Sequence, residues 1–260
     1  MEKQNLYKKR TKELRERFGD VASEYEMYRF EYPIELYNCI FSYSSEGKEA
    51  LEIGIGTGKA TLPILEKNYE VTAVEPVKRM LEIARKKYNG KNITFINTTF
   101  EELKYGKQYD LIYAASSFQW INGCDRLKKV FDLLKDGGTF ARFKTINIID
   151  ATKHTNNQIL IDIYLKYLPD YLPSDMDRKH MSDEEYVQFG FCNMERHEYL
   201  INHICEVDRY IQFINTYTEY ISLSNEIKHK FENAINNELS GKQIVITQKC
   251  SLFLAKKHGE

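Results

Sequence analysis

Hydrophobic and polar residues alternate along the middle of the chain in a pattern that predicts strands separated by helices. Short apolar runs of strand character occupy 51–53, 71–74, 93–96, 111–114 and 138–143. Between them, apolar residues recur at helical spacing in two segments: Val77, Met80, Leu81, Ala84 and Tyr88, then Leu127, Val130, Phe131 and Leu134. Strands that alternate with helices predict a mostly parallel, doubly wound sheet over residues 49–145, and therefore an α/β fold.

After Thr145 the alternation stops and the sequence becomes rich in helix patterns. One apolar stripe at helical spacing comprises Tyr210, Phe213, Tyr217 and Tyr220, and a second comprises Ile227, Phe231, Ala234, Ile235 and Leu239. Strand character returns at 191–200 and at 243–255. These two segments are expected to complete a seven-stranded sheet as its antiparallel C-terminal edge.

The first strand leads into a glycine-rich turn, Leu-Glu-Ile-Gly-Ile-Gly-Thr-Gly at 51–58. Glycines at this spacing let the backbone turn sharply and approach a ligand closely. Dinucleotide folds place a third glycine where this chain has Lys59. Glu52 is unfavourable beside a phosphate, but it suits a ligand that carries an ammonium group, such as S-adenosylmethionine (SAM). About 20 residues after the first glycine of the turn, Glu75 ends the next strand, at the distance typical of a ribose-binding carboxylate.

Residues 49–145 resemble the core of the Rossmann-like (class I) SAM-dependent methyltransferases. Five blocks follow that family's order: 51–58, Val-Glu-Pro at 74–76, Phe-Glu-Glu-Leu at 100–103, Tyr-Asp-Leu-Ile at 109–112 and Leu-Lys-Asp-Gly-Gly at 134–138. Further residues resemble a small-molecule branch that includes trans-aconitate methyltransferase-like (type 11) proteins; they are Tyr25, Arg29, Tyr32, Pro33, Leu36 and the segment 117–120.

The resemblance implies a set of cofactor-binding residues. Glu52 would hold the methionine ammonium, with Gly54, Gly56 and Gly58 in the turn. Glu75 would bind the ribose hydroxyls, and Pro76 would pack on the adenine with Val77. Ala114 would offer its carbonyl to the ammonium. The family often has an acidic residue where this chain has Thr99 and Phe100, so adenine recognition is expected to depend on a weaker acceptor, on backbone and on stacking.

Tyr25 and Arg29 lie four residues apart on a predicted helix and share one face. The resemblance implies that both close over the cofactor, with Arg29 reaching the methionine carboxylate or an acidic acceptor; a surface pair packed on the cap is the alternative. Trp120, the one tryptophan, either walls an acceptor pocket or anchors the next helix. Tyr217 is an acceptor-contact candidate, although a stripe of this kind more often reflects plain packing than a pocket.

Methyl transfer from a sulfonium depends mainly on positioning, so no catalytic triad is expected. A carboxylate acceptor needs no base, whereas a phenol or an ammonium does, and His154, His180 and His197 are the candidates. The residues after the fourth strand, Ala-Ser-Ser-Phe at 115–118, differ from the Asn/Asp-Pro-Pro-aromatic motif of nucleic-acid amino-methyltransferases.

Charge also argues against a nucleic-acid partner, because Lys plus Arg number 37 and Asp plus Glu number 38. The basic cluster Lys8-Lys9-Arg10 is interpreted as a solvated helix face. Five cysteines, including Cys124, are widely spaced without a Cys-x-x-Cys motif, and the histidines form no helical ligand pair. No metal and no disulfide framework are expected. The absence of an apolar leader or of a membrane-length run predicts a cytoplasmic protein with no membrane partner.

One methyltransferase domain is therefore expected over 1–260. It divides into an N-terminal helical cap (1–46), a SAM-binding core (47–145), helical substrate-cap insertions (146–190 and 206–240) and closing strands (191–205 and 243–256). The expected function is methyl transfer from SAM to a small-molecule acceptor, for which the resemblance favours a carboxylate and Arg29 or Arg142 would bind the charge. A monomer or homodimer is expected. The alternative function is a protein that binds SAM or S-adenosylhomocysteine without transfer activity. A nicotinamide-dependent dehydrogenase is disfavoured by Glu52 and Lys59.

Overall fold

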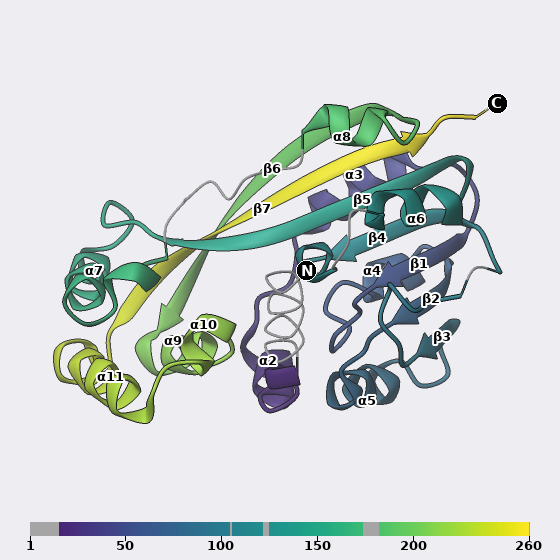
Figure 1. Ribbon diagram of the computed structural model, residues 1–260. Coiled ribbons are helices and arrows are strands. Elements are labelled where there is room, and N and C mark those ends of the chain that lie inside the picture. Colours follow the sequence, from purple (N-terminus) through teal and green to yellow (C-terminus); the bar gives the residue numbers. More distant parts are fainter. Residues whose placement is uncertain (1–15, 105, 122–124, 174–181, 260) are drawn as a thin grey trace, which may run out of the picture.

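The computed structural model describes residues 16–104, 106–121, 125–173 and 182–259. These residues form a seven-stranded sheet in the order β3-β2-β1-β4-β5-β7-β6 (Figure 1). The strands are β1 Glu49–Ile53, β2 Glu70–Val74, β3 Ile93–Ile96, β4 Tyr109–Ala115, β5 Leu134–Ile149, β6 Phe191–Glu206 and β7 Gln243–Lys257. Strands β1 to β5 pair in parallel, and β7 runs antiparallel to both β5 and β6. The predicted mostly parallel α/β sheet with antiparallel C-terminal strands is confirmed.

Helices cover both faces of the parallel part of the sheet. The described helices are α2 Ala22–Tyr28, α3 Ile34–Tyr43, α4 Leu62–Glu66, α5 Lys78–Lys87, η1 Phe118–Trp120, α6 Arg126–Leu133, α7 Thr155–Tyr167, η2 Pro169–Tyr171, α8 Asp183–Val187, α9 Val207–Ile214, α10 Thr218–Ile221 and α11 Asn225–Leu239. One core cluster joins α3, α4 and α5 to the sheet, and another joins α6 and α8 to its other face. Burial on both faces explains why the central strands read as continuous apolar runs.

The three antiparallel strands form a long arm that extends beyond the parallel strands to a separate group of helices (Figure 1). Strand β5 pairs with β7 from Thr139 to Ile149, and β6 pairs with β7 from Phe191 to Glu206. At the far end of the arm, α7, α9 and α11 pack in a third core cluster around Leu160, Tyr210 and Phe231. We refer to α7, α9, α10 and α11 as the helical cap.

The structure refines three features of the sequence prediction. The outermost antiparallel strand is β6, while the C-terminal β7 lies between β5 and β6. Strand β5 begins before the Gly137 turn and continues to Ile149, past the expected boundary at Thr145. The tyrosine stripe at 210–220 is divided between α9 and α10, because the chain turns at 215–217 and Tyr217 adopts an extended conformation. The basic cluster at 8–10, Cys124 and His180 lie outside the described residues.

No helix in the described ranges is both long and apolar enough to cross a membrane.

Candidate functional site

The turn after β1 has the backbone geometry that its glycines predict. Gly54 and Gly56 adopt positive φ angles of 71° and 58°, a region that favours glycine. A Cβ on Gly54 would lie 2.6 Å from the Cβ of Ser117, so a side chain has no room there. The turn therefore brings bare backbone to the carboxyl edge of the sheet, where open α/β folds bind ligands.

Glu52 is buried next to this turn with half of its carboxylate unpaired. Its side chain is 1% exposed. Oε2 accepts hydrogen bonds from Thr61 Oγ1 at 2.7 Å and from the Tyr113 hydroxyl at 2.8 Å. Oε1 is buried and has no hydrogen-bond partner among the described residues. A buried acceptor without a donor is costly, and since Glu52 lines a pocket, Oε1 is available to a ligand.

Burial also changes the ionisation of Glu52. Desolvation, with a smaller contribution from the negative charge of Glu75, raises the pKa of Glu52 to about 7, against the hydrogen bonds from Thr61 and Tyr113 that lower it. A cationic ligand group beside Oε1 would favour the ionised form and so reverse this shift.

Glu75 directly follows β2, on the other side of the glycine turn. Its Oε2 accepts a hydrogen bond from the Gly56 backbone N–H, and its Oε1 accepts one from the Val77 N–H, both at 2.9 Å. Each carboxylate oxygen has two acceptor sites. These two backbone contacts fix the orientation of the Glu75 carboxylate at the pocket.

The two glutamates line one pocket that is partly open to solvent. Its lining comes from the β1 turn, the β2 end, α5, the segment after β3, the β4 end with η1, and the N-terminal segment. The lining residues are Phe18, Tyr25, Tyr32, Glu52–Gly56, Lys59, Ala60, Val74–Val77, Met80, Phe100, Glu101, Ala115–Ser117, Trp120 and Ile121. Segments that are far apart in the sequence thus meet at the carboxyl ends of β1, β2 and β4.

Three aromatic side chains form one wall of the pocket. The Phe18 ring meets Tyr25 edge-on at 6.0 Å between centroids, and it meets Trp120 edge-on at 5.7 Å. Such edge-to-face pairs are favourable ring arrangements. Trp120 and Tyr25 therefore both lie at the pocket, with Phe18 between them.

Tyr32 and Ser116 place two hydroxyl groups in the same pocket. Their oxygens are 3.0 Å apart. Burial, with a smaller contribution from Tyr25, raises the pKa of Tyr32 well above its usual value, so Tyr32 stays protonated and acts as a hydrogen-bond donor. Ser116 has a positive φ of 52°, an uncommon conformation for a residue other than glycine.

Three predicted cofactor residues lie outside the described pocket lining. Gly58 packs against Tyr88, whose hydroxyl donates to the Gly58 carbonyl at 2.6 Å; a Cβ there would meet the Tyr88 ring at 2.4 Å. Thr99 accepts from the Glu102 N–H and caps a local turn, which leaves Phe100 and Glu101 facing the pocket. Ala114 is fully buried because β4 continues one residue further, so Ala115 occupies the strand end.

Arg29 also lies outside the described lining, because it connects the end of α2 to the helical cap. Its Nε donates to Thr216 Oγ1 at 2.7 Å and its Nη2 donates to the Thr216 carbonyl at 2.9 Å. The guanidinium carbon lies 3.8 Å from the centroid of the Tyr217 ring. Tyr217 in turn accepts a hydrogen bond from the Asn147 side chain on β5. Arg29 and Tyr217 thus form one contact between the N-terminal segment and the cap, which we call the Arg29 clasp.

Arg142 does not approach the pocket either. It packs against aromatic residues of the core cluster that contains α6 and α8. Its guanidinium lies 5.8 Å from the Phe118 ring centroid and 5.7 Å from that of Phe253. Burial lowers the pKa of Arg142.

Several pocket residues were not selected from the sequence. Phe18 and Ser116 gave no motif signal, whereas Glu101 and Ser117 lie in segments that resemble the family but were given no role. Lys59 was noted only as a missing glycine; in the structure it lines the pocket and its Nζ pairs with Glu31 at 2.8 Å. Position relative to the strand ends was therefore a better guide to the pocket-lining residues than residue type.

Comparisons with known proteins place residues 50–138 in a family model described as a methyltransferase domain. The chain is 33% identical over 127 residues to the Saccharomyces cerevisiae protein "Probable S-adenosylmethionine-dependent methyltransferase CRG1", which covers 46% of this chain and 44% of that protein. It is 32% identical over 133 residues to the malonyl-[acyl-carrier protein] O-methyltransferase of Priestia megaterium, covering 48% of each. The chain spans about half the length of these curated relatives.

Among solved structures, a protein described as a type II methyltransferase from Anaeromyxobacter dehalogenans matches with a TM-score of 0.65 and 17% identity, over 90% of this chain and 100% of that one. The resemblance to SAM-dependent class I methyltransferases and the Rossmann-like fold are confirmed. SAM is the cofactor that this family implies.

Proposed function

We propose that this chain, whose residues 50–138 match a methyltransferase-domain family model, binds SAM and transfers its methyl group to a small-molecule carboxylate. The observation that carries the cofactor assignment is the buried Oε1 of Glu52, which has no partner among the described residues, beside a turn where Gly54 leaves no room for a side chain. A ligand with an ammonium group and no phosphate fits that site.

The two pocket glutamates would bind opposite ends of the ligand. Glu52 would accept from the methionine ammonium, and Glu75, oriented by the Gly56 and Val77 N–H groups, would accept from the ribose hydroxyls. Val77, Met80 and Phe100 offer apolar surface for the adenine. Pro76 lies with them. Bound SAM supplies an electrophilic methyl group on a sulfonium, and the protein's task is to align the acceptor with it.

A carboxylate acceptor is consistent with the groups at the aromatic end of the pocket. Tyr32 is a protonated donor, and the positive charge of Arg29 interacts electrostatically with the Tyr32 side chain. No histidine lines the pocket within the described part of the chain, which matters little for a carboxylate because it attacks without losing a proton. The acceptor oxygen forms the new C–O bond while the C–S bond breaks, and the thioether leaves with its electron pair.

The malonyl-[acyl-carrier protein] O-methyltransferases to which the chain is similar are named for methyl transfer to oxygen on an acid, which supports the same acceptor class. We assign the choice of acceptor to the helical cap and to the aromatic wall that contains Trp120, because both adjoin the segment that carries Tyr25 and Tyr32. The absence of a nucleic-acid partner and the cytoplasmic location stay predictions.

The test is methyl transfer from labelled SAM to a panel of small carboxylates, amines and phenols, with products identified by mass spectrometry. Methyl esters should form, and Tyr32→Phe should lower kcat/KM by about 5–10-fold, the value of one neutral hydrogen bond, while leaving SAM affinity unchanged. SAM binding without transfer to any acceptor would favour a binding protein without transfer activity. Methylation of amines alone would overturn the carboxylate assignment.

A further inference from the structure

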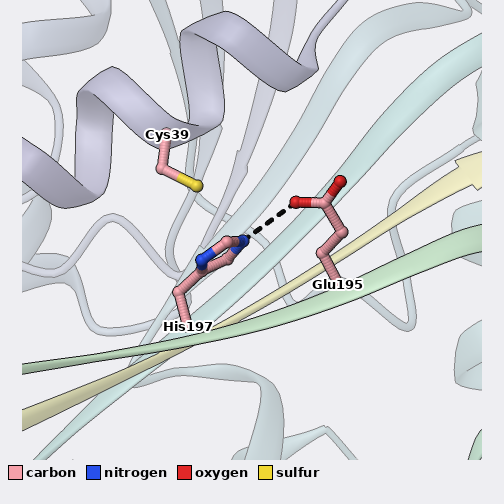
Figure 2. Close-up of side chains that lie close together, drawn as sticks. All are labelled: Cys39, Glu195 and His197. Atoms are coloured by element: carbon pink, nitrogen blue, oxygen red, sulfur yellow. Dashed lines mark hydrogen bonds and ion pairs between the residues drawn. The ribbon is translucent and has the colours of Figure 1, made fainter.

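A second group of chemically reactive side chains lies outside the pocket, between α3 and the edge strand β6. It comprises Cys39, Glu195 and His197, whose ligand atoms all lie within 4.8 Å of one another. Figure 2 shows the Cys39 thiol directed from α3 towards the His197 ring, with Glu195 beside it on β6. A His197 ring nitrogen and a Glu195 oxygen are 2.9 Å apart.

We propose that Cys39, Glu195 and His197 bind a divalent cation of the Zn²⁺ type. A thiolate, an imidazole and a carboxylate form the mixed sulfur, nitrogen and oxygen donor set that Zn²⁺ accepts in four-coordinate sites. Mg²⁺ and Ca²⁺ prefer oxygen ligands alone, so this set disfavours them. Three protein ligands leave one coordination position for water or an anion.

The distances need only small adjustments to meet this geometry. Zinc bonds of about 2.0–2.3 Å in a tetrahedral arrangement put neighbouring ligand atoms about 3.3–3.6 Å apart. The present separations run from 2.9 Å between His197 and Glu195 up to the 4.8 Å limit of the cluster. Side-chain rotations of about 1 Å would bring all three atoms to a common centre, and the half-exposed His197 and exposed Glu195 have room to make them.

The backbone holds the ligands on well-packed elements. Helix α3 is anchored in the core by Leu36 and Ile40, both 0% exposed. Strand β6 contains an irregularity between Cys192 and Glu195, where Asn193 adopts a positive φ of 51°. Bulges of this kind redirect side chains and occur often next to functional sites. After the bulge, residues 195 and 197 point to the same side of β6, towards α3 (Figure 2).

Tyr199 adds a partner for the sulfur ligand. It is the next residue on the same side of β6, and its side chain is hydrogen-bonded to Cys39. The hydroxyl of Tyr199 is therefore within reach of the Cys39 sulfur. A hydroxyl that donates to a metal-bound thiolate orients the ligand and moderates its charge, as outer partners do in zinc sites.

The test uses the full chain without a histidine tag, stripped with a chelator and kept reduced. Calorimetric titration with Zn²⁺ should show one equivalent bound, and titration with Co²⁺ should produce a thiolate-to-metal absorption band. Cys39→Ser should remove that band and weaken Zn²⁺ binding about 100-fold, and His197→Gln should weaken it at least 10-fold. Because the thiol loses its proton on binding, affinity should rise with pH.

Cys192→Ser is the matched control, since Cys192 is a half-exposed thiol on the same strand, outside the three-residue cluster. This variant should bind metal as the unsubstituted protein does. Thermal unfolding of the metal-free forms checks that each variant is folded. The proposal is overturned if no saturable one-equivalent binding occurs, or if Cys39→Ser binds Zn²⁺ as tightly as the unsubstituted protein.

Discussion

Strand β1 carries two glutamates, three residues apart, that lie in opposite environments. Glu49, at the start of the strand, forms ion pairs with Lys135 at 2.5 Å and with Lys107 at 2.9 Å, and these contacts lower its pKa. Glu52, at the end, has an unpaired carboxylate oxygen and a pKa raised to about 7 by burial. The carboxylate at the amino end of β1 is therefore paired, whereas the one near its carboxyl end has an oxygen without a partner among the described residues.

The same contrast extends across neighbouring strands. At the amino ends, Asp110 of β4 accepts from the Glu49 N–H at 2.9 Å and pairs with Lys135 at 3.0 Å. At the carboxyl ends, Gly54, Gly56 and Ser116 adopt left-handed conformations around a pocket. Natural proteins store strain and unsatisfied groups at functional sites when the surrounding fold supports them. This difference supports our proposal that the ligand binds at the carboxyl edge and that the amino edge stabilises the fold.

The largest expected effect comes from Glu52→Gln, which removes the unpaired charge. The folded protein keeps the Glu52 proton up to about pH 7, whereas the unfolded chain releases it near 4.5, so stability falls between these values and stays lower above pH 7. The difference corresponds to about 3 kcal/mol. Glu52→Gln should therefore stabilise the ligand-free protein at pH 8 by up to about 3 kcal/mol, and much less at pH 4.5, in chemical unfolding.

The same substitution should weaken SAM binding by about 1–3 kcal/mol, the value of a charged hydrogen bond. A gain in stability together with a loss of SAM affinity would show that Glu52 serves ligand binding at the expense of stability. Loss of stability at pH 8 together with unchanged affinity would contradict the assigned role. Glu75→Ala should also weaken SAM binding, without the gain in stability, because it removes the acceptor for the Gly56 and Val77 N–H groups.

Two glycine substitutions separate the two edges. Gly54→Ala introduces a Cβ 2.6 Å from that of Ser117 at a positive φ and should weaken SAM affinity by about 2 kcal/mol or more. Gly47→Ala places a Cβ 2.1 Å from the Asp110 carboxylate, so it should lower the melting temperature while the folded protein binds SAM normally. Calorimetric affinity and thermal unfolding should be measured on both variants. A loss of SAM affinity in Gly47→Ala would contradict the separation of the two edges.

The pH dependence of SAM affinity should follow Glu52. Below pH 7 the carboxyl is protonated in the free protein, so affinity should fall by about tenfold for each further pH unit. It should level off above 7, before the ligand's own ammonium loses its proton near pH 8. Glu52→Gln should abolish the decline below pH 7. A decline that persists in this variant would assign the titration to another group.

A smaller effect is expected at the Arg29 clasp. Arg29→Lys keeps the charge but loses the two contacts with Thr216 and the planar stacking on Tyr217. Hydrogen exchange in α9 and α10 should speed up by an amount equivalent to about 1 kcal/mol, with little change in SAM affinity. A loss of SAM affinity greater than tenfold would instead support the cofactor role predicted from the sequence.

The smallest effect should come from Glu49→Gln at the supported edge. Its ion pairs are half-exposed, and such pairs contribute below about 1 kcal/mol. Stability should fall slightly, and less at high salt, while SAM affinity stays unchanged. This variant is the matched control for Glu52→Gln, since it makes the same chemical change in the same strand.

The sequence allowed accurate prediction where local pattern determines structure. The sheet follows from short apolar runs and glycine turns, and Glu52 and Glu75 are placed by the strand ends on which they lie. The pocket position of Ala115 was missed by one residue, since apolar patterns do not define the last residue of a buried strand. Thr99 was expected to face the adenine but caps a turn instead, an alternative that short polar side chains often adopt.

Contacts between distant segments could not be predicted. The pairing of Arg29 with Thr216 joins residues 187 positions apart, and the group formed by Cys39, Glu195 and His197 depends on how α3 packs against β6. Neither has a spacing signal in the sequence, because the fold alone brings these residues together. The cap interface and the proposed metal site both fall in this class.

The most direct test of the central claim is calorimetric titration of the ligand-stripped protein with SAM, S-adenosylhomocysteine and NAD at pH 7.5, with Glu49→Gln and Glu52→Gln measured in parallel. We expect one-to-one binding of the two methionine nucleosides, no response to NAD, normal affinity in Glu49→Gln and weakened affinity in Glu52→Gln. Failure of both nucleosides to bind, or equal affinity in the two variants, would contradict the assignment of the carboxyl edge as a SAM site built around Glu52.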